Sequence, residues 1–189
     1  MKIIITLAAV ALAAALGQPL IDRDGVLSFA RATEDYAFMH RRLERRLPAM
    51  AVNANPETIR QAIDAMAAAV RAARPDARQG DFFNPRVQAA IRVRIARALQ
   101  IHGLTPADVR AAELADGIDP AGVTLHINGA FPWAIGTAMV PCILEALPPL
   151  PPELQYRMVG RDLVLIDVHA SLVIDILAGA LAESGTVDK

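Results

Sequence analysis

The sequence predicts an α+β fold: an N-terminal bundle of about four helices, a proline-rich strap and a small C-terminal antiparallel β-meander. Three observations predict it. Apolar residues recur every three or four positions over residues 26–115, prolines crowd residues 116–152, and apolar residues then alternate every second position. With the amino terminus, these patterns divide the chain into a signal peptide (1–17), a helical region (18–115), the strap (116–152) and the meander with its tail (153–189).

The amino-terminal segment has the pattern of an export signal. Lys2 gives a positive start, residues 3–16 form an uncharged apolar run, and Ala13, Ala15 and Gly17 are the small residues that signal peptidase requires. The run is shorter than the roughly 20 residues that span a bilayer. We therefore expect cleavage near Ala15 to Gly17, export to the periplasm and no membrane span in the mature chain. An uncleaved amino-terminal anchor is the alternative.

The helical region begins with a helix predicted from Val26 to Leu47, which Pro48 ends. Its stripe follows alternating spacings of three and four. It comprises Val26, Phe29, Thr33, Tyr36, His40, Leu43 and Leu47.

Three further helices open on a capping residue followed by proline: Asn55-Pro56, Asn84-Pro85 and Thr105-Pro106. Gly103 can terminate the third helix. The buried faces are predicted to be Ile59, Ile63, Met66, Val70 and Ala73 in the second helix, and Val87, Ile91, Ile95, Ala98 and His102 in the third. Four amphipathic helices with short connections indicate a small bundle.

The strap cannot hold a long helix, because prolines interrupt it at 132, 141, 148, 149, 151 and 152. Its apolar side chains predict an ordered segment packed on the protein. These are Phe131, Trp133, Ile135, Ile143 and Leu144.

The meander is predicted from three short runs: residues 154–158, 163–168 and 172–177. Turns at Gly160-Arg161 and at residues 169–171 join them. A helix over residues 171–181 competes for the third run, since period alone does not separate short apolar runs. So small a sheet needs cover from the strap, the helices or a second copy, which leaves a homodimer open.

The charge distribution and the single cysteine limit the contacts and cross-links that the chain can form. Residues 31–97 hold 13 arginines against 7 acidic residues, and residues 98–189 hold 4 basic against 11 acidic residues. We expect the two halves to attract each other and dock; a basic face for an anionic partner is the alternative. Cys142 is the only cysteine, so it forms no intramolecular disulfide, and we expect it to be buried.

The densest basic cluster comprises Arg41, Arg42, Arg45 and Arg46, which form two adjacent rows beside the apolar stripe. It is a candidate site for a protein or an anionic envelope component such as a membrane surface; a solvated helix face is the simpler interpretation. No nucleic-acid partner is expected, since the cluster lacks interleaved aromatic residues and the protein is predicted to be exported.

Histidines and acidic residues are the candidates for metal binding and for acid–base catalysis. Asp167 and His169 are two apart and share a strand face, where they form a weak candidate for a metal site or for a base with its orienting carboxylate; a polar turn is the simpler interpretation. His40 and His102 lie on predicted core stripes, where they either meet or form separate hydrogen bonds. No nucleophile, phosphate or dinucleotide motif is present, so no cofactor is expected and enzymatic activity stays open.

Residues 138–177 contain a distinctive string. It contains Val140-Pro141, Leu147-Pro148-Pro149-Leu150-Pro151, Tyr156 to Asp167 and Val173-Ile174-Asp175. It resembles the carboxy-terminal module of an uncharacterised family of small exported bacterial proteins, and looks like the tail of RcnB-type periplasmic nickel and cobalt homeostasis proteins. The resemblance implies a periplasmic β-meander. The resemblance does not imply a role in metal homeostasis, because the expected histidine-rich stretches are missing.

The sequence therefore predicts an exported periplasmic protein whose role is a non-catalytic envelope interaction or accessory function. One alternative is a periplasmic metal-binding or metal-sensing protein, suggested by Asp167 with His169. A second is a hydrolase with dispersed carboxylates, for which Glu34, Asp35, Asp162 and Asp167 are available.

Overall fold

The computed structural model describes residues 7–48, 55–115, 120, 122–135 and 139–181; the side chains of residues 7–22 and 113–115 are not described. The predicted cleavage site and the tail beyond residue 181 therefore lie outside the described side chains. The helices are α1 (Leu7–Glu44), α2 (Pro56–Ala73), α3 (Pro85–Ile101), α4 (Pro106–Ala115), the 3₁₀ turn η1 (Trp133–Ile135) and α5 (Pro141–Ala146). The strands are β1 (Leu154–Val159), β2 (Asp162–Asp167) and β3 (Leu172–Leu177).

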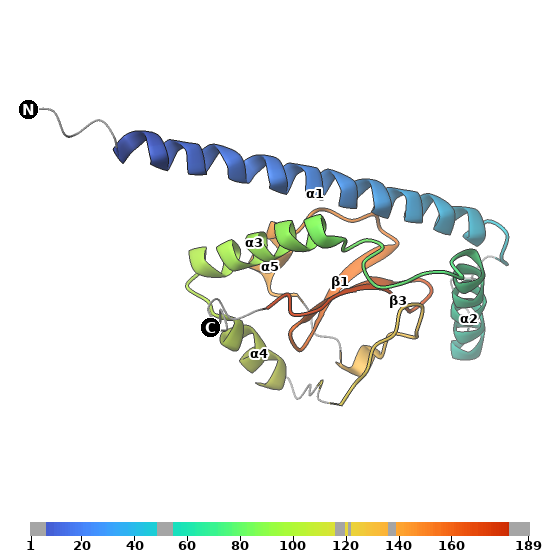
Figure 1. Cartoon of the computed structure of the whole chain (residues 1–189). Coiled ribbons are helices and arrows are strands. Elements are labelled where there is room, and N and C mark those ends of the chain that lie inside the picture. Colours follow the sequence, from blue (N-terminus) through green and yellow to red (C-terminus); the bar gives the residue numbers. More distant parts are fainter. Residues whose placement is uncertain (1–6, 49–54, 116–119, 121, 136–138, 182–189) are drawn as a thin grey trace, which may run out of the picture.

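The predicted α+β class is confirmed, with the helices before a three-stranded sheet (Figure 1). The sheet is an antiparallel meander of order β1-β2-β3, in which Leu154 pairs with Asp167 and Asp167 with Leu172. The competing helix over 171–181 is wrong, because residues 172–177 form β3. Pairing with β2 and burial on both faces give this apolar run more contacts than a surface helix provides.

Both faces of the sheet are covered, each by a different part of the chain. Leu163, Leu165 and Ile174 pack with α1, α3 and α5 in the larger core, while Val164, Ile166 and Val173 pack with residues of the strap in a smaller one. The register shifts between Leu165 and Ile166. The meander thus lies between the helices, which include α5 of the strap, and residues 125–135 of the strap, and the covering it needs comes from the same chain.

The long helix α1 lies beside α3 and carries the predicted stripe (Figure 1). Phe29, Thr33, Tyr36 and His40 are buried. Thr33 donates its hydroxyl to the backbone oxygens of Phe29 and Ala30, which satisfies this polar group inside the core. The helix begins at Leu7 instead of Val26 and ends at Glu44, three residues before the predicted Leu47.

The predicted caps of α2 and α3 are confirmed, whereas parts of their buried faces are wrong. The side chain of Asn55 accepts from the Thr58 amide, and that of Asn84 from the amides of Arg86 and Val87. Gly103 takes a positive φ of 65° and ends α3. However, Ile59, Ala73 and His102 are exposed, because α2 buries only Met66, Ala67 and Val70 and His102 lies beyond the last turn of α3.

The strap is ordered where it is described, and it extends the sheet. Phe131 donates to the Ser171 oxygen, Asn128 donates to the Val173 oxygen, and Ala130 forms an isolated antiparallel bridge with Leu172. Phe131 and Ile143 are buried, but Trp133 and Leu144 are 46% and 51% exposed, contrary to prediction. Cys142 is buried, as predicted.

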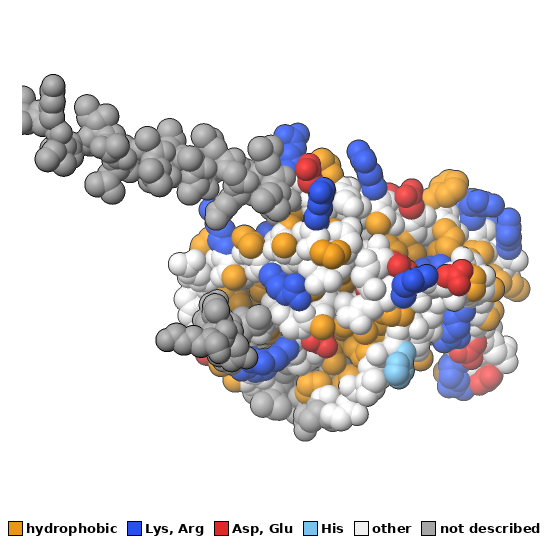
Figure 2. Space-filling view, viewed as in Figure 1, with side chains coloured by type: hydrophobic (Ala, Val, Ile, Leu, Met, Phe, Trp, Pro, Cys, Tyr) orange, Lys and Arg blue, Asp and Glu red, His pale blue; other side chains and the backbone are white. Residues whose placement is uncertain are grey.

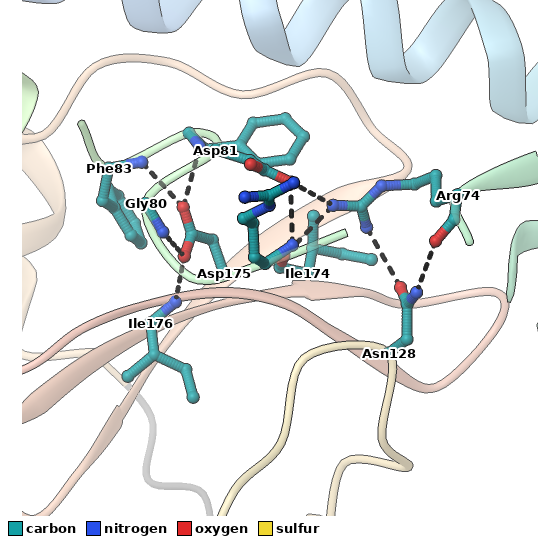
Figure 3. Close-up of polar contacts among 10 residues, drawn as sticks. Arg74, Gly80, Asp81, Phe83, Asn128, Ile174, Asp175 and Ile176 are labelled. Carbon is teal, nitrogen blue, oxygen red and sulfur yellow. Dashed lines mark hydrogen bonds and ion pairs between the residues drawn. The ribbon is translucent and has the colours of Figure 1, made fainter. Parts of the chain in front are cut away.

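A buried carboxylate attaches the α2–α3 loop to β3 (Figure 3). Asp175 is fully buried and accepts four backbone N–H groups, at 2.7–2.9 Å, from Gly80, Phe82, Phe83 and Ile176. Arg74 extends the attachment, since it bonds the Asn128 side chain and lies over the rings of Tyr36 and Phe82. These contacts fix the start of α3 against the sheet.

Charged residues also join the two halves of the chain. Arg41 of the basic half bonds Glu153 of the acidic half at 3.0 Å, and Glu153 is buried. Other arginines are spread over the surface instead of gathering in one patch on the face seen in Figure 2. The arrangement agrees with docking between the halves as one use of the charge asymmetry.

Both tyrosines of the chain are buried, which predicts a cooperative response to alkali. Burial raises the pKa of Tyr36 and Tyr156 far above the ordinary value of 10.0. A raised folded-state pKa adds stability that is complete below about pH 10 and is lost as pH rises, by up to about 1.4 kcal/mol per pH unit for each tyrosine. Near-ultraviolet absorbance should therefore show tyrosinate only as circular dichroism shows unfolding. Tyrosinate that titrates near pH 10 in the folded protein would contradict this burial.

Candidate metal centre

The end of α1 presents a row of polar side chains to the sheet. Tyr36, His40 and Glu44 are each four residues apart, so they lie on one helix face. Burial changes along the row: Tyr36 and His40 are buried, and the Glu44 side chain is 56% exposed. The row therefore leads from the core to the surface.

The turn between β2 and β3 meets this row. Asp167, the last residue of β2, accepts the amides of His169 and Ala170 through Oδ1, at 2.9 and 2.7 Å. Such a bond from an aspartate to the amides that follow it fixes a tight turn. It holds His169 beside α1, where its ring centroid lies 5.2 Å from that of His40.

Three potential metal ligands come together at this junction. One ligand atom each from His40, Glu44 and His169 lie within 4.8 Å of one another, and His169 Nδ1 lies 3.7 Å from Glu44 Oε1. Ligands of a tetrahedral metal about 2.1 Å away lie roughly 3.4 Å apart. Because Glu44 and His169 are about half exposed, small rotations of these two side chains can close the remaining gap.

Asp167 lies behind the three ligands and contacts the buried histidine. Its Oδ2 accepts the Tyr36 hydroxyl at 2.6 Å and lies 3.2 Å from His40 Nε2. Burial acts to raise the pKa of Asp167, but the contacts with His40, Tyr36 and the Ala170 amide outweigh it and hold the pKa below its ordinary value. Asp167 therefore stays ionised and orients His40.

His40 has no satisfied ring nitrogen among the described residues, although its side chain is fully buried. The Nε2 contact with Asp167 is short but poorly directed, and Nδ1 makes no hydrogen bond. A buried, unpaired ring nitrogen is costly. With Nε2 turned to Asp167, Nδ1 is the nitrogen that remains for a metal ion.

The structure thus joins the predicted pair Asp167 and His169 to residues that the sequence did not connect with it. The predicted alternative contact of His40 with His102 is wrong, because His102 is exposed at the end of α3. Glu44 had not been singled out as a ligand. Its spacing of four from His40 was the available signal, but the third ligand, His169, lies far away in sequence.

The predicted interaction cluster flanks the same site. Arg41 bonds Glu153, while Arg42 lies over the exposed Phe38 ring, 6.0 Å from its centroid. Arg45 and Arg46 are exposed in the turn that follows Glu44. Within the described parts of the chain, none of Arg42, Arg45 and Arg46 forms an ion pair.

The acidic residues considered for hydrolysis lie in different surroundings. Asp162, at the start of β2, accepts the amide of Gly179 in the turn after β3 at 2.8 Å, and Glu34 and Asp35 are exposed on α1. A largely apolar groove of about 450 Å³ lies between α5 and β1, lined by Leu144, Glu145, Leu147, Pro148, Pro149, Leu150, Leu154, Gln155 and Tyr156. Its lining includes none of the ligands or the acids above.

Comparisons with protein-family models, curated proteins and solved structures found no match to this chain. Across the helices that the structure describes, none has the length and apolar character that crossing a membrane requires.

Proposed function

We propose that this chain is a divalent-metal-binding protein of the bacterial periplasm, and that His40, Glu44 and His169 hold the metal ion. The observation that carries the proposal is the buried His40, whose Nδ1 has no hydrogen-bond partner among the described residues, within 4.8 Å of two exposed ligands from α1 and the β2–β3 turn. Two imidazoles and one carboxylate favour late divalent metals such as zinc, nickel, cobalt or copper over calcium and magnesium.

Asp167 supports the proposal as a partner of the metal ligand His40. Histidines that bind metals usually donate their second ring nitrogen to a carboxylate or carbonyl, which fixes the tautomer. Asp167 is fully buried and lies 3.2 Å from His40 Nε2, in the place such a partner takes. A metal on Nδ1 would also remove the cost of the unpaired nitrogen.

The periplasmic location rests on the amino-terminal pattern of Lys2, the apolar run and the small residues up to Gly17. Fractionation of producing cells, with mass measurement of the exported protein, tests it. A mature chain beginning near residue 18 in the periplasmic fraction supports export. Retention of the intact chain in the cytoplasm would refute it.

Calorimetric titration of the purified mature protein tests metal binding. We expect one equivalent of Zn²⁺, Ni²⁺, Co²⁺ or Cu²⁺ to bind with a Kd at or below about 1 μM. His169→Ala and Glu44→Gln should each weaken binding at least about tenfold, since even losing a partner of a ligand costs 10–100-fold. Both side chains are about half exposed, so these variants should fold.

The matched control is His102→Ala, which removes an exposed histidine from the end of α3. It should bind metal as the wild type does. Binding of all four metals weaker than about 100 μM, or equal affinity in the wild type and both ligand variants, would refute the site.

A further inference from the structure

We propose that the metal ion at this site keeps a coordination position open to solvent, and that an oxyanion, carboxylate or phosphate, fills it with the help of the arginines at the end of α1. This inference rests on the proposed metal site. It adds the chemical class of a second ligand and gives the basic cluster a role.

The burial of the three ligands shows where the open position lies. His40 is fully buried and closes the inner side of the site, whereas the side chains of Glu44 and His169 are 56% and 48% exposed. Structural zinc sites use four protein ligands, whereas three protein ligands leave a position for water or another molecule. Here that position faces solvent beside Glu44 and His169.

The charge around the site favours an anion in that position. The charges of Glu44 and Asp167 together balance a divalent cation, and Arg41 is balanced by Glu153. Arg42, Arg45 and Arg46 are exposed and form no ion pair with the described residues, so they leave a net positive charge. Arg45 and Arg46 directly follow the ligand Glu44 in the turn after α1.

Arginine is well suited to recognise the ligand class proposed. Its planar guanidinium forms paired hydrogen bonds with carboxylate or phosphate oxygens, and those oxygens also bind divalent metals. An oxyanion on the metal can therefore use one oxygen for the ion and others for a guanidinium. A neutral ligand could occupy the metal but would gain nothing from the arginines.

Visible absorption of the protein with one equivalent of Co²⁺ tests the inference, because the bands of bound cobalt change with its ligands. Acetate, inorganic phosphate and neutral imidazole are titrated separately at low ionic strength. We expect all three to shift the bands. Comparison of the acetate and phosphate curves shows which oxyanion is preferred.

The double variant Arg45→Gln/Arg46→Gln tests whether the positive charge of these arginines helps to bind the oxyanion. Even without a direct hydrogen bond, at roughly 8 Å in water, each arginine contributes enough attraction for about a twofold effect, so the variant should bind acetate and phosphate at least about fivefold more weakly. Imidazole affinity should not fall. The control Arg86→Gln/Arg97→Gln removes the same charge from exposed positions on α3 and should match the wild type.

The outcomes separate this inference from the metal site itself. No cobalt spectrum at all refutes the metal site. A cobalt spectrum that none of the three ligands changes shows closed coordination and overturns the inference. A response to imidazole alone, or oxyanion affinities that are equal in the Arg45/Arg46 variant and the wild type, overturns it too.

Discussion

Replacing Asp175 by alanine is expected to reduce the free energy of unfolding by about 3–5 kcal/mol, because several buried backbone donors lose their common acceptor at once. The carboxylate is fully buried and accepts four backbone N–H groups, three of them from the α2–α3 loop. Alanine accepts none of them, and each buried donor left without a partner costs roughly 1–3 kcal/mol before relaxation. The loop and the start of α3 should therefore detach from β3.

Urea unfolding followed by circular dichroism measures this loss. Asp162→Ala is the matched control, since Asp162, a partly exposed residue at the start of β2, accepts one amide, that of Gly179. Its cost should stay near 1 kcal/mol. Equal unfolding midpoints for the two variants would show that Asp175 does not hold the loop.

Asp167→Asn is expected to lower metal affinity by about 10–100-fold, as loss of a ligand's orienting partner does. The asparagine oxygen can still accept the amides of His169 and Ala170, which Asp167 now binds through Oδ1. Its NH₂ group, however, then faces His40 Nε2 and donates to it. The His40 proton must move to Nδ1, the nitrogen proposed to bind the metal.

Asp167→Ala measures how much Asp167 contributes to the stability of the protein, apart from its role in orienting His40. It leaves the Tyr36 hydroxyl, His40 and two amides without their acceptor and should cost about 3–5 kcal/mol of stability. Tyr36→Phe, which removes one hydroxyl donated to Asp167, should cost roughly 1–3 kcal/mol and spare the metal affinity. If Asp167→Asn binds metal as tightly as the wild type, then Asp167 does not position His40.

Local chemistry explains what could be predicted from the sequence. Asn55 and Asn84 cap helices because their side chains reach amides two or three residues away, so the signal lies within a few residues. The alternation in β1 and the continuous apolar run of β2 likewise depend on neighbours along the chain. The local pattern does not assign the third strand, because pairing with β2 decides between strand and helix for residues 172–177.

The candidate site was only half visible in the sequence for the same reason. Asp167 and His169 are neighbours, and their pairing through a turn is local. His40 and Glu44 lie on one helix face, but nothing near them indicates that β2 ends beside that face. Asp175 shows the same limit, since its partners are amides of a loop more than ninety residues earlier.

Exposure was the least predictable property. Trp133, Leu144 and Ile59 are apolar residues in the expected regions, yet all three are exposed. Composition indicates that such segments pack against the protein, but which side chain faces the sheet depends on the path of the backbone. His102 is exposed for a similar reason, because α3 ends at Ile101 and the helical face that is buried does not extend to this residue.

Anomalous X-ray diffraction from crystals grown with one equivalent of Zn²⁺ locates the metal ion independently of its affinity and so tests the site formed by His40, Glu44 and His169. The structure predicts one strong peak about 2.0–2.2 Å from His40 Nδ1, a His169 ring nitrogen and a Glu44 carboxylate oxygen. Zinc peaks that lie only elsewhere, or the absence of any peak between α1 and the β2–β3 turn, would show that these residues do not bind the metal.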